Sequence, residues 1–382
     1  MKIEITLIIC ICWFYPTKIS AQNETVRESP VSFEAVYTGD FVRNFTGGIK
    51  KGSAYLGLAN LKISFDTDRA RLWKGGQFFV NAANAHGGDP STTLIGDFHT
   101  VSNIEADEMT YIHELWFKQT FNQFEIIAGL QDLNTDFVSS EYGAMFINST
   151  FGTPSTIADN VPSPIFPFTT VGLSMKWKIS GHNTWKIALF DGLPTEMEKN
   201  PYNLKWDLDK NEGLFAVSEY QYSGQLKNGL KSSYRAGIYY HSQLLVSDAG
   251  DIQTEQFRYN YGFYLIADQM LYQKSDGGGL GIFAQIAISP KAINSHCRYI
   301  GAGLSYEGFR NRAEDKFGIA VTNAGFSNSV KKDETILEIC YKAQLTENIF
   351  IQPDFQYVIN PEGTEENLAN AMVGFVRFGL NF

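Results

Sequence analysis

The feature that most constrains this chain is a strict alternation of apolar and polar residues that recurs in many separate stretches. In 348–359, apolar residues share one parity and polar residues share the other, and the same holds in 232–242, 257–268 and 334–345. Successive side chains of a β-strand point to opposite faces, so a period of two predicts strands with one apolar and one polar face. The stretches are about ten residues long, which suits tilted membrane strands better than the shorter strands of soluble sheets.

Alternating stretches of this kind follow one another along the whole chain. We expect strands at 33–45, 53–67, 76–86, 111–121, 124–132, 169–180, 183–192, 213–224, 232–243, 257–270, 279–290, 298–309, 316–324, 334–345, 348–359 and 371–382. Aromatic residues make up 14% of the chain and 34 residues are glycine, yet few stretches are strongly apolar. Alternation between lipid-facing and lumen-facing residues produces this profile, so we predict an all-β transmembrane antiparallel barrel of about 16 strands over 33–382.

The first residues indicate export. Lys2 precedes an apolar stretch that runs to Tyr15, and Ile19-Ser20-Ala21 provides small residues suited to cleavage before Gln22. This layout predicts a secretory signal peptide at 1–21, too short to span a membrane as a helix. Residues 22–32 would then form a short periplasmic lead.

The lengths of the connections give a second indication. Connections after even strands are mostly short, whereas those after odd strands include 87–110, 133–168, 193–212 and 244–256. Short turns at one end and long loops at the other are typical of outer-membrane barrels. The longest, 133–168, would be the third external loop, and we expect it to fold into the lumen.

Charge and cysteine content exclude some partners and cofactors. The formal net charge is −10, and an acidic chain is a poor partner for nucleic acid. Cys10 and Cys12 leave with the signal peptide, and Cys297 and Cys340 could form a disulfide. Two cysteines without metal-ligand spacing predict no zinc site, and no nucleotide or nucleophile motif predicts a cofactor or an enzyme.

Five segments in the first half carry a family resemblance. They are Tyr37–Asp40 with Arg43-Asn44, Gly47-Gly48 and Tyr55–Gly57; His86–Ser91 with Gly96-Asp97 and Val101–Ala106; Ala128–Asn134 with Phe137; Asn148–Gly152 with Ser163–Pro167; and Asp191–Pro194. In this order, they make the chain resemble the carbohydrate-selective porin (OprB) family. The second half shows less motif, and the lead is shorter than in relatives with an extra N-terminal domain.

The resemblance implies a protein of the bacterial outer membrane that lets small carbohydrates diffuse passively, without a cofactor. Its partners would be small saccharides in the lumen and outer-membrane lipid outside. Both a monomer and a homotrimer agree with the sequence. Two other functions stay open: a soluble secreted β-rich carbohydrate-binding protein, whose strands would not close into a barrel, and a barrel hydrolase that uses one of six histidines.

Sugars present hydroxyl groups and flat C–H faces, so a sugar-selective pore needs charged hydrogen-bonding groups and aromatic surfaces. Glu114, Trp116 and Lys118 share the polar face of strand 111–121 and could bind a saccharide or form a structural network.

Further candidates stand in the first family segment and near the third loop. Arg43 could line the pore or form an ion pair across it. Asp132, Asn134 and Asp136 could shape the constriction or cap turns. Other inward charges that could contact the substrate or merely solvate the lumen are Glu219, Arg235 and Asp354.

Overall fold

The computed structural model describes residues 29–194, 199–206, 208, 212–226, 229–247, 255–275, 278–309, 312–327, 331–364 and 367–382. The signal peptide expected at 1–21, and most of the lead expected at 22–32, lie outside these residues.

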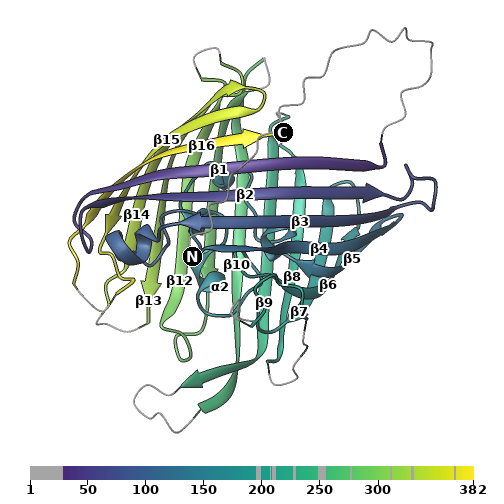
Figure 1. The fold of residues 1–382 in the computed structure, drawn as a ribbon, viewed down its shortest axis with the longest axis horizontal. Coiled ribbons are helices and arrows are strands. Elements are labelled where there is room, and N and C mark those ends of the chain that lie inside the picture. Colours follow the sequence, from purple (N-terminus) through teal and green to yellow (C-terminus); the bar gives the residue numbers. More distant parts are fainter. Residues whose placement is uncertain are drawn as a thin grey trace, which may run out of the picture.

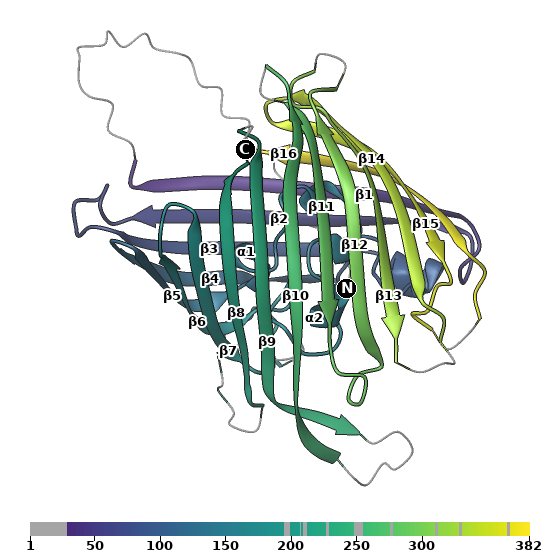
Figure 2. The same cartoon turned by 180° about the vertical axis from the view of Figure 1, so that it is seen from behind.

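The described chain forms sixteen strands in one closed antiparallel sheet (Figures 1 and 2). Their bounds are β1 Val31–Thr46, β2 Gly52–Asp66, β3 Gly76–Gly87, β4 Met109–Phe121, β5 Phe124–Gln131, β6 Thr170–Lys178, β7 Asn183–Asp191, β8 Leu214–Gln225, β9 Lys231–Ser247, β10 Glu255–Gln273, β11 Gly279–Ile288, β12 His296–Glu307, β13 Lys316–Phe326, β14 Glu334–Thr346, β15 Ile349–Ile359 and β16 Ala371–Asn381. Each strand pairs with its neighbours in sequence, and β1 pairs with β16, with Asp40 opposite Arg377. The predicted barrel is therefore confirmed, and closure excludes the open sheets of the soluble alternative.

The outer face carries the apolar set of each alternating strand. Large apolar side chains there remain exposed: Phe41, Leu61, Leu173, Leu189, Ile238, Phe263, Leu265, Ile286, Leu304, Ile319, Leu337, Ile351 and Val376. In β14, for example, Leu337 and Ile339 are 46% and 42% exposed, whereas the intervening Glu338 is 1% exposed. An apolar outer band around the whole barrel matches the hydrocarbon layer of a membrane.

The long connections lie at one end of the barrel because they all follow odd strands. Two of them matter for the site: L2 (residues 88–108) and L3 (residues 132–169). L2 contains η1 Ser91–Ile95, and L3 contains α1 Leu133–Asp136, η2 Gly143–Met145, η3 Ser149–Phe151 and α2 Ser155–Ala158. Among the described residues, no helix has both the length and the apolar character needed to cross a bilayer.

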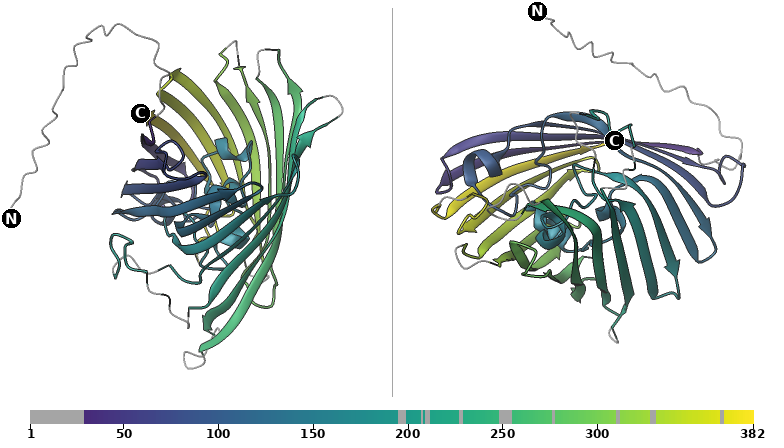
Figure 3. Two further views of the ribbon diagram at one scale, coloured as in Figure 1. Left: turned by 90° about the vertical axis from the view of Figure 1, so that its right-hand side faces the viewer. Right: turned by 90° about the horizontal axis from the view of Figure 1, so that it is seen from below.

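L3 lies inside the ring of strands, as the blue and teal segment in Figure 3 shows. Its apolar side chains pack on the inner wall formed by β7 to β12. The cluster comprises Leu133, Phe137, Val138, Ile157 and Val161 of L3 with Ala188, Phe190, Phe215, Val217, Tyr239, Tyr264, Ile266, Ala287 and Tyr299 of the wall. Burial of each large apolar side chain contributes roughly 1.5–3 kcal/mol, so this contact fixes L3 against one side of the lumen.

Polar side chains of the wall add directional contacts to the backbone of L3. Glu219 of β8 accepts from Val138 N at 2.9 Å, and Asp268 of β10 accepts from Tyr142 N at 3.2 Å. The hydroxyls of Tyr239 and Tyr299 each donate to an L3 carbonyl at 2.7 Å. Hydrogen bonds to charged groups are stronger than neutral ones, which explains why inward acids accompany an inward loop.

L2 packs on the opposite part of the wall, near the seam between β1 and β16. Its apolar residues Leu94, Ile95, Val101 and Ile104 form a cluster with Val42, Leu56, Ile336, Val358, Ala371, Val373 and Phe375 of the strands and Ile147 of L3. The two loops also meet directly, because Asn103 N donates to Ile147 O at 2.9 Å. L2 and L3 together therefore set how much of the lumen stays open.

Candidate functional site

Two of the cavities in the lumen lie between both inward loops and the wall. The larger, of about 580 Å³, is lined by strand residues from β1 to β4 and from β12 to β16 and by parts of both loops. The smaller, of about 310 Å³, is lined mainly by L2 and L3. The two cavities share three lining residues, Asn103, Asp132 and Phe166. These three side chains stand where one cavity meets the next, which defines a candidate constriction.

Each constriction residue is held by a different part of the fold. Asn103 belongs to L2, and its Oδ1 accepts from the guanidinium of Arg377 at 2.8 Å. Asp132 begins L3, where its Oδ1 caps α1 by accepting from Asn134 N at 2.7 Å. Phe166 comes near the end of L3. The constriction therefore brings together both ends of one loop and the middle of another.

A histidine connects the acidic and aromatic parts of the constriction. His113 Nε2 lies 3.0 Å from Asp132 Oδ2, and the His113 ring meets the Phe166 ring edge-on with centroids 5.9 Å apart. Thr169, the last residue of L3, adds a contact to the wall, because its hydroxyl donates to the His113 carbonyl at 2.6 Å. This arrangement orients a carboxylate and a ring toward the same opening.

The larger cavity combines acidic and basic groups. Its acids are Glu114, Asp132, Glu141 and Glu307, and its bases are Lys62, Lys316, Lys342 and Arg377. Some of these charges are paired: Lys316 lies 3.5 Å from Glu307, and Arg377 pairs with Asp40 at 2.7 Å. Such a lining offers donors and acceptors to a solute with many hydroxyl groups while its charges partly cancel.

The three residues predicted to share one face of β4, Glu114, Trp116 and Lys118, are in contact with one another in the structure. Glu114 lines the larger cavity and accepts from Trp116 Nε1 at 3.2 Å. Trp116 stacks on Phe79 with ring centroids 4.7 Å apart, and Lys118 Nζ lies 5.8 Å from the Trp116 ring centre. Of these three side chains, only Glu114 lines the larger cavity. Trp116 and Lys118 continue along the inner wall as a stacked column, so we keep only Glu114 as a candidate for contact with a solute.

Acidic groups of the loops set the charge of the smaller cavity. Burial raises the pKa of Glu105 in L2 to about 7, although hydrogen bonds from Ser91 oppose the shift. Glu105 lines the smaller cavity together with Asp159, whose side chain is exposed to the lumen, so the charge of this cavity changes near neutral pH.

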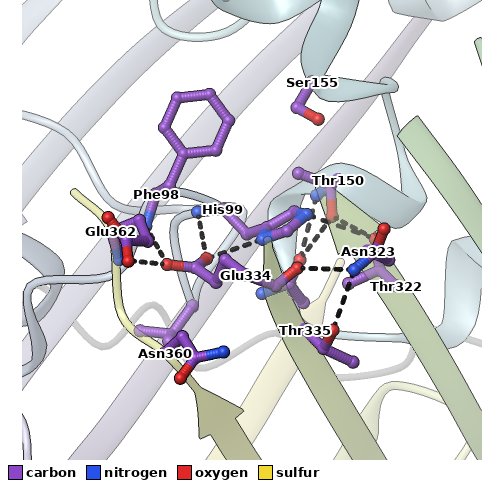
Figure 4. Close-up of polar contacts among 12 residues, drawn as sticks. Phe98, His99, Thr150, Ser155, Thr322, Asn323, Glu334, Thr335, Asn360 and Glu362 are labelled. Carbon is purple, nitrogen blue, oxygen red and sulfur yellow. Dashed lines mark hydrogen bonds and ion pairs between the residues drawn. The ribbon is translucent and has the colours of Figure 1, made fainter. Parts of the chain in front are cut away.

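A hydrogen-bond network around Glu334 holds L2 and the connection between β15 and β16 against the wall near the smaller cavity (Figure 4). Glu334 of β14 accepts from the backbone amides of Phe98, His99 and Glu362 at 2.8, 3.0 and 2.8 Å. His99 Nδ1 lies 2.6 Å from the same carboxylate, and its Nε2 lies 3.4 Å from Thr322 Oγ1 of β13. One buried acid therefore ties L2 and the connection between β15 and β16 to the wall.

The remaining residues predicted for the pore fall into two groups. Asn134 lines the smaller cavity and donates to Gly152 O at 3.1 Å within L3, and Asp136 accepts through its carbonyl from Lys186. Glu219 is fully buried under L3. Arg235 pairs with Asp268 at 2.8 Å, and both line a further cavity of about 210 Å³ that shares Glu141 and Tyr142 with the larger cavity. These four residues hold L3 or its supporting wall.

Two further predictions need revision. Arg43 lies on the outer face, where its NH1 donates to Ser53 Oγ at 2.9 Å and its guanidinium lies over Phe45. It shares the parity of exposed Phe41 and Phe45, so the expectation that it lines the pore is wrong. Asp354 does face inward, but it is 6% exposed and lies outside the lining of either cavity.

Sequence reasoning missed two of the three constriction residues. Asn103 and Phe166 stand in the family segments Val101–Ala106 and Ser163–Pro167, but nothing in their local pattern distinguishes them from turn residues. His113 was missed for another reason: the β3–β4 register shifts between Asn81 and Ala82, which lets His113 and Glu114 both lie buried on the inner side. Strict alternation would have placed His113 outside.

The described residues give little support to the hydrolase alternative. Ser155 Oγ lies 2.9 Å from His296 Nε2, the geometry of a nucleophile and its base. Both side chains are fully buried, and His296 Nδ1 faces the Gly325 carbonyl at 3.2 Å, where a triad would have a carboxylate. Cys297 and Cys340 are free thiols, so the disulfide considered from the sequence is not formed.

Comparison with known proteins points in one direction. Residues 50–382 match the family described as carbohydrate-selective porin, OprB family. Porin B of Pseudomonas aeruginosa is 22% identical over 93% of this chain and 88% of its own length. The putative porin QuiX of Acinetobacter baylyi is 21% identical, with 94% and 91% covered. A solved high-pH structure of Pseudomonas putida OprB superposes with a TM-score of 0.82 at 21% identity, covering 92% of this chain and 94% of that one.

Proposed function

We propose, from the premise that the chain belongs to the carbohydrate-selective porin (OprB) family, that its two cavities form one path for the passive diffusion of small saccharides. Family membership, which confirms the resemblance found in the sequence, makes the protein a channel of the bacterial outer membrane. The narrow point of the proposed path lies at Asn103, Asp132 and Phe166.

The observation that carries the proposal is the sharing of these three residues by both cavities. An amide and a carboxylate can exchange hydrogen bonds with sugar hydroxyls as the solute loses its water. The Phe166 ring offers an apolar surface to the C–H face of a pyranose. A passing saccharide would thus replace water contacts on one side and bury its flat face on the other.

The size of the larger cavity agrees with a small solute. Its volume of about 580 Å³ lies within the ~300–1,000 Å³ that is usual for small-molecule sites. Since L2 and L3 are both fixed to the wall and meet each other at Asn103 and Ile147, we propose that the space they leave open sets an upper size limit. Monosaccharides and short saccharides would pass, and long chains would be retained.

Liposome swelling tests the proposal directly. Proteoliposomes should swell in isotonic monosaccharide and should stay unchanged in a long oligosaccharide. Asp132→Asn and Phe166→Ala should each change the monosaccharide rate, because a charged hydrogen bond and a stacking surface are worth about 1–3 kcal/mol. Arg43→Ala, on the outer face, is the matched control and should leave the rate unchanged.

Two results would contradict the proposal. The reconstituted wild type could leave liposomes impermeable to sugars, in which case the cavities are not a path. Alternatively, Asp132→Asn and Phe166→Ala could both behave like Arg43→Ala, in which case the narrow point lies elsewhere.

A further inference from the structure

Three buried side chains that the diffusion path does not use converge at the junction of β14 and β15. Glu338 and Cys340 occupy successive inward positions of β14, and Asp354 of β15 pairs in register with Cys340. One oxygen of each carboxylate and the Cys340 sulfur all lie within 4.8 Å of one another. Their exposed fractions are 1%, 2% and 6%, so the cluster is closed off from bulk water.

The two carboxylates of the cluster differ in their hydrogen bonding. Glu338 accepts from Ile147 N of L3 at 2.6 Å and, through its other oxygen, from Asn148 N at 3.1 Å. A backbone amide only donates, so both Glu338 oxygens act as acceptors toward L3. Neither oxygen of Asp354 meets the geometry of a hydrogen bond, and its nearest polar neighbours are the Glu338 carboxylate and the Gln356 amide. A buried carboxylate in this condition requires a cation or a proton.

The bases nearby are committed to other groups. The Arg377 guanidinium donates to both oxygens of Asp40 at 2.7 and 2.8 Å and also to Asn103. Lys342 Nζ lies 3.9 Å from the centre of the Phe350 ring. The two carboxylates therefore face each other and a thiol without a base that bonds to Asp354.

The donor set fits a particular class of cation. Zinc accepts both cysteine sulfur and carboxylate oxygen at about 2.0–2.3 Å, so donors this close can reach one ion with small side-chain adjustments. Calcium and magnesium take oxygen ligands and do not favour a thiolate. Three protein ligands would leave a fourth position for water.

We propose that Glu338, Cys340 and Asp354 bind one divalent cation of the zinc class. Through Glu338, the bound cation would fasten the Ile147-Asn148 segment of L3 to the wall. Entry from the lumen is short, because Lys342 and Gln352, the next inward positions on the two strands, line the larger cavity. Binding requires the thiolate, so the Cys340 proton is released to solvent as the sulfur–metal bond forms.

Metal titration of the full-length mature protein in detergent tests the site. After treatment with a chelator, the wild type should take up one Zn²⁺ per chain in calorimetry. Co²⁺ as a second probe should produce the near-ultraviolet absorption of a thiolate–cobalt bond. Cys340→Ser and Asp354→Asn should each weaken Zn²⁺ binding by at least about tenfold, since even supporting residues around a metal have effects of that size.

The chain offers a matched control in its other described cysteine. Cys297 of β12 is also buried, and its sulfur contacts Gly325 O at 3.5 Å, away from the cluster. Cys297→Ser should bind Zn²⁺ as the wild type does, and the mobility of unheated protein on gels verifies that every variant is folded. Added Zn²⁺ should also slow hydrogen exchange at the amides of Ile147 and Asn148.

Three outcomes would overturn the proposal. One is the absence of saturable Zn²⁺ binding by the wild type at micromolar concentration, and another is unchanged binding in Cys340→Ser. The third is a proton in place of the metal: Asp354→Asn would then match or exceed the wild type in stability, with no metal bound to either protein. None of these measurements depends on sugar flux, so the diffusion path and the metal site can fail separately.

Discussion

The substitution Glu219→Ala tests whether wall acids hold L3 in place. Glu219 is fully buried and makes three contacts: Val138 N at 2.9 Å, Tyr264 OH at 3.0 Å and Lys186 Nζ at 3.0 Å. Removal of one member of a buried ion pair typically costs about 3–5 kcal/mol. Lys186 keeps the Asp136 carbonyl as an acceptor, so we expect the loss of the ion pair to cost about 3 kcal/mol, the lower end of this range. The Val138 amide loses its acceptor, which adds about 1–3 kcal/mol.

We therefore expect Glu219→Ala to lower the free energy of unfolding by about 4 kcal/mol, which is close to a thousandfold in the equilibrium. Denaturant unfolding of the barrel in detergent, followed by tryptophan fluorescence, measures this loss. Lys186→Met removes the buried ammonium, so the double variant should lose about 2 kcal/mol less than the sum of the single losses. Strict additivity, or a loss under about 1 kcal/mol for Glu219→Ala, would refute the anchoring role.

Two further predictions concern pH and the tyrosine contacts. Burial raises the pKa of Glu105 to about 7, so the native state binds the proton more tightly than the unfolded state, and the stability contributed by this group falls as pH rises from about 4.5 to 7. In the folded protein the Glu105 carboxyl ionises around its own pKa of about 7, so the smaller cavity gains negative charge between about pH 6 and 8. Cation preference measured from reversal potentials should thus increase with pH and should increase less in Glu105→Gln; an identical pH profile would contradict this. Tyr299→Phe leaves the buried Thr150 carbonyl without the donor at 2.7 Å and should cost about 1–2 kcal/mol in denaturant unfolding. Tyr240→Phe on the outer face is its control, and equal losses in both would show that the hydroxyl contact contributes nothing.

Strand positions were predictable because their signal is local. The side-chain period of a strand is two, so the polarity of neighbouring residues reveals both the strand and the face that turns inward. The prediction for Arg43 was wrong because it relied on the position of Arg43 in a family segment and not on the alternation of residues in the strand. Arg43 shares the parity of Phe41 and Phe45, which identifies the outer face from the sequence alone. At His113 the rule itself failed, because a register shift in β3–β4 changes which residues point inward.

The site depends on contacts between residues far apart in sequence. Val138 meets Glu219 at a separation of 81 residues, and Arg377 meets Asn103 at a separation of 274. Such contacts arise only when the sheet closes and L2 and L3 pack against its inner face. No local pattern encodes which inward acid accepts from which loop amide, since any polar inward residue satisfies the alternation equally well.

The sequence by itself determined the sixteen strands, their inner and outer faces and the ends at which long loops occur. These features follow from the alternation of polar and apolar residues within each strand, from the lengths of the connections, and from the lipid that surrounds the barrel. Only the tertiary structure decided that Asn103, Asp132 and Phe166 share one opening, and that Asp354 faces Cys340 at the β14–β15 junction. Strand register and loop packing set these meetings, and both are fixed by the closed barrel as a whole.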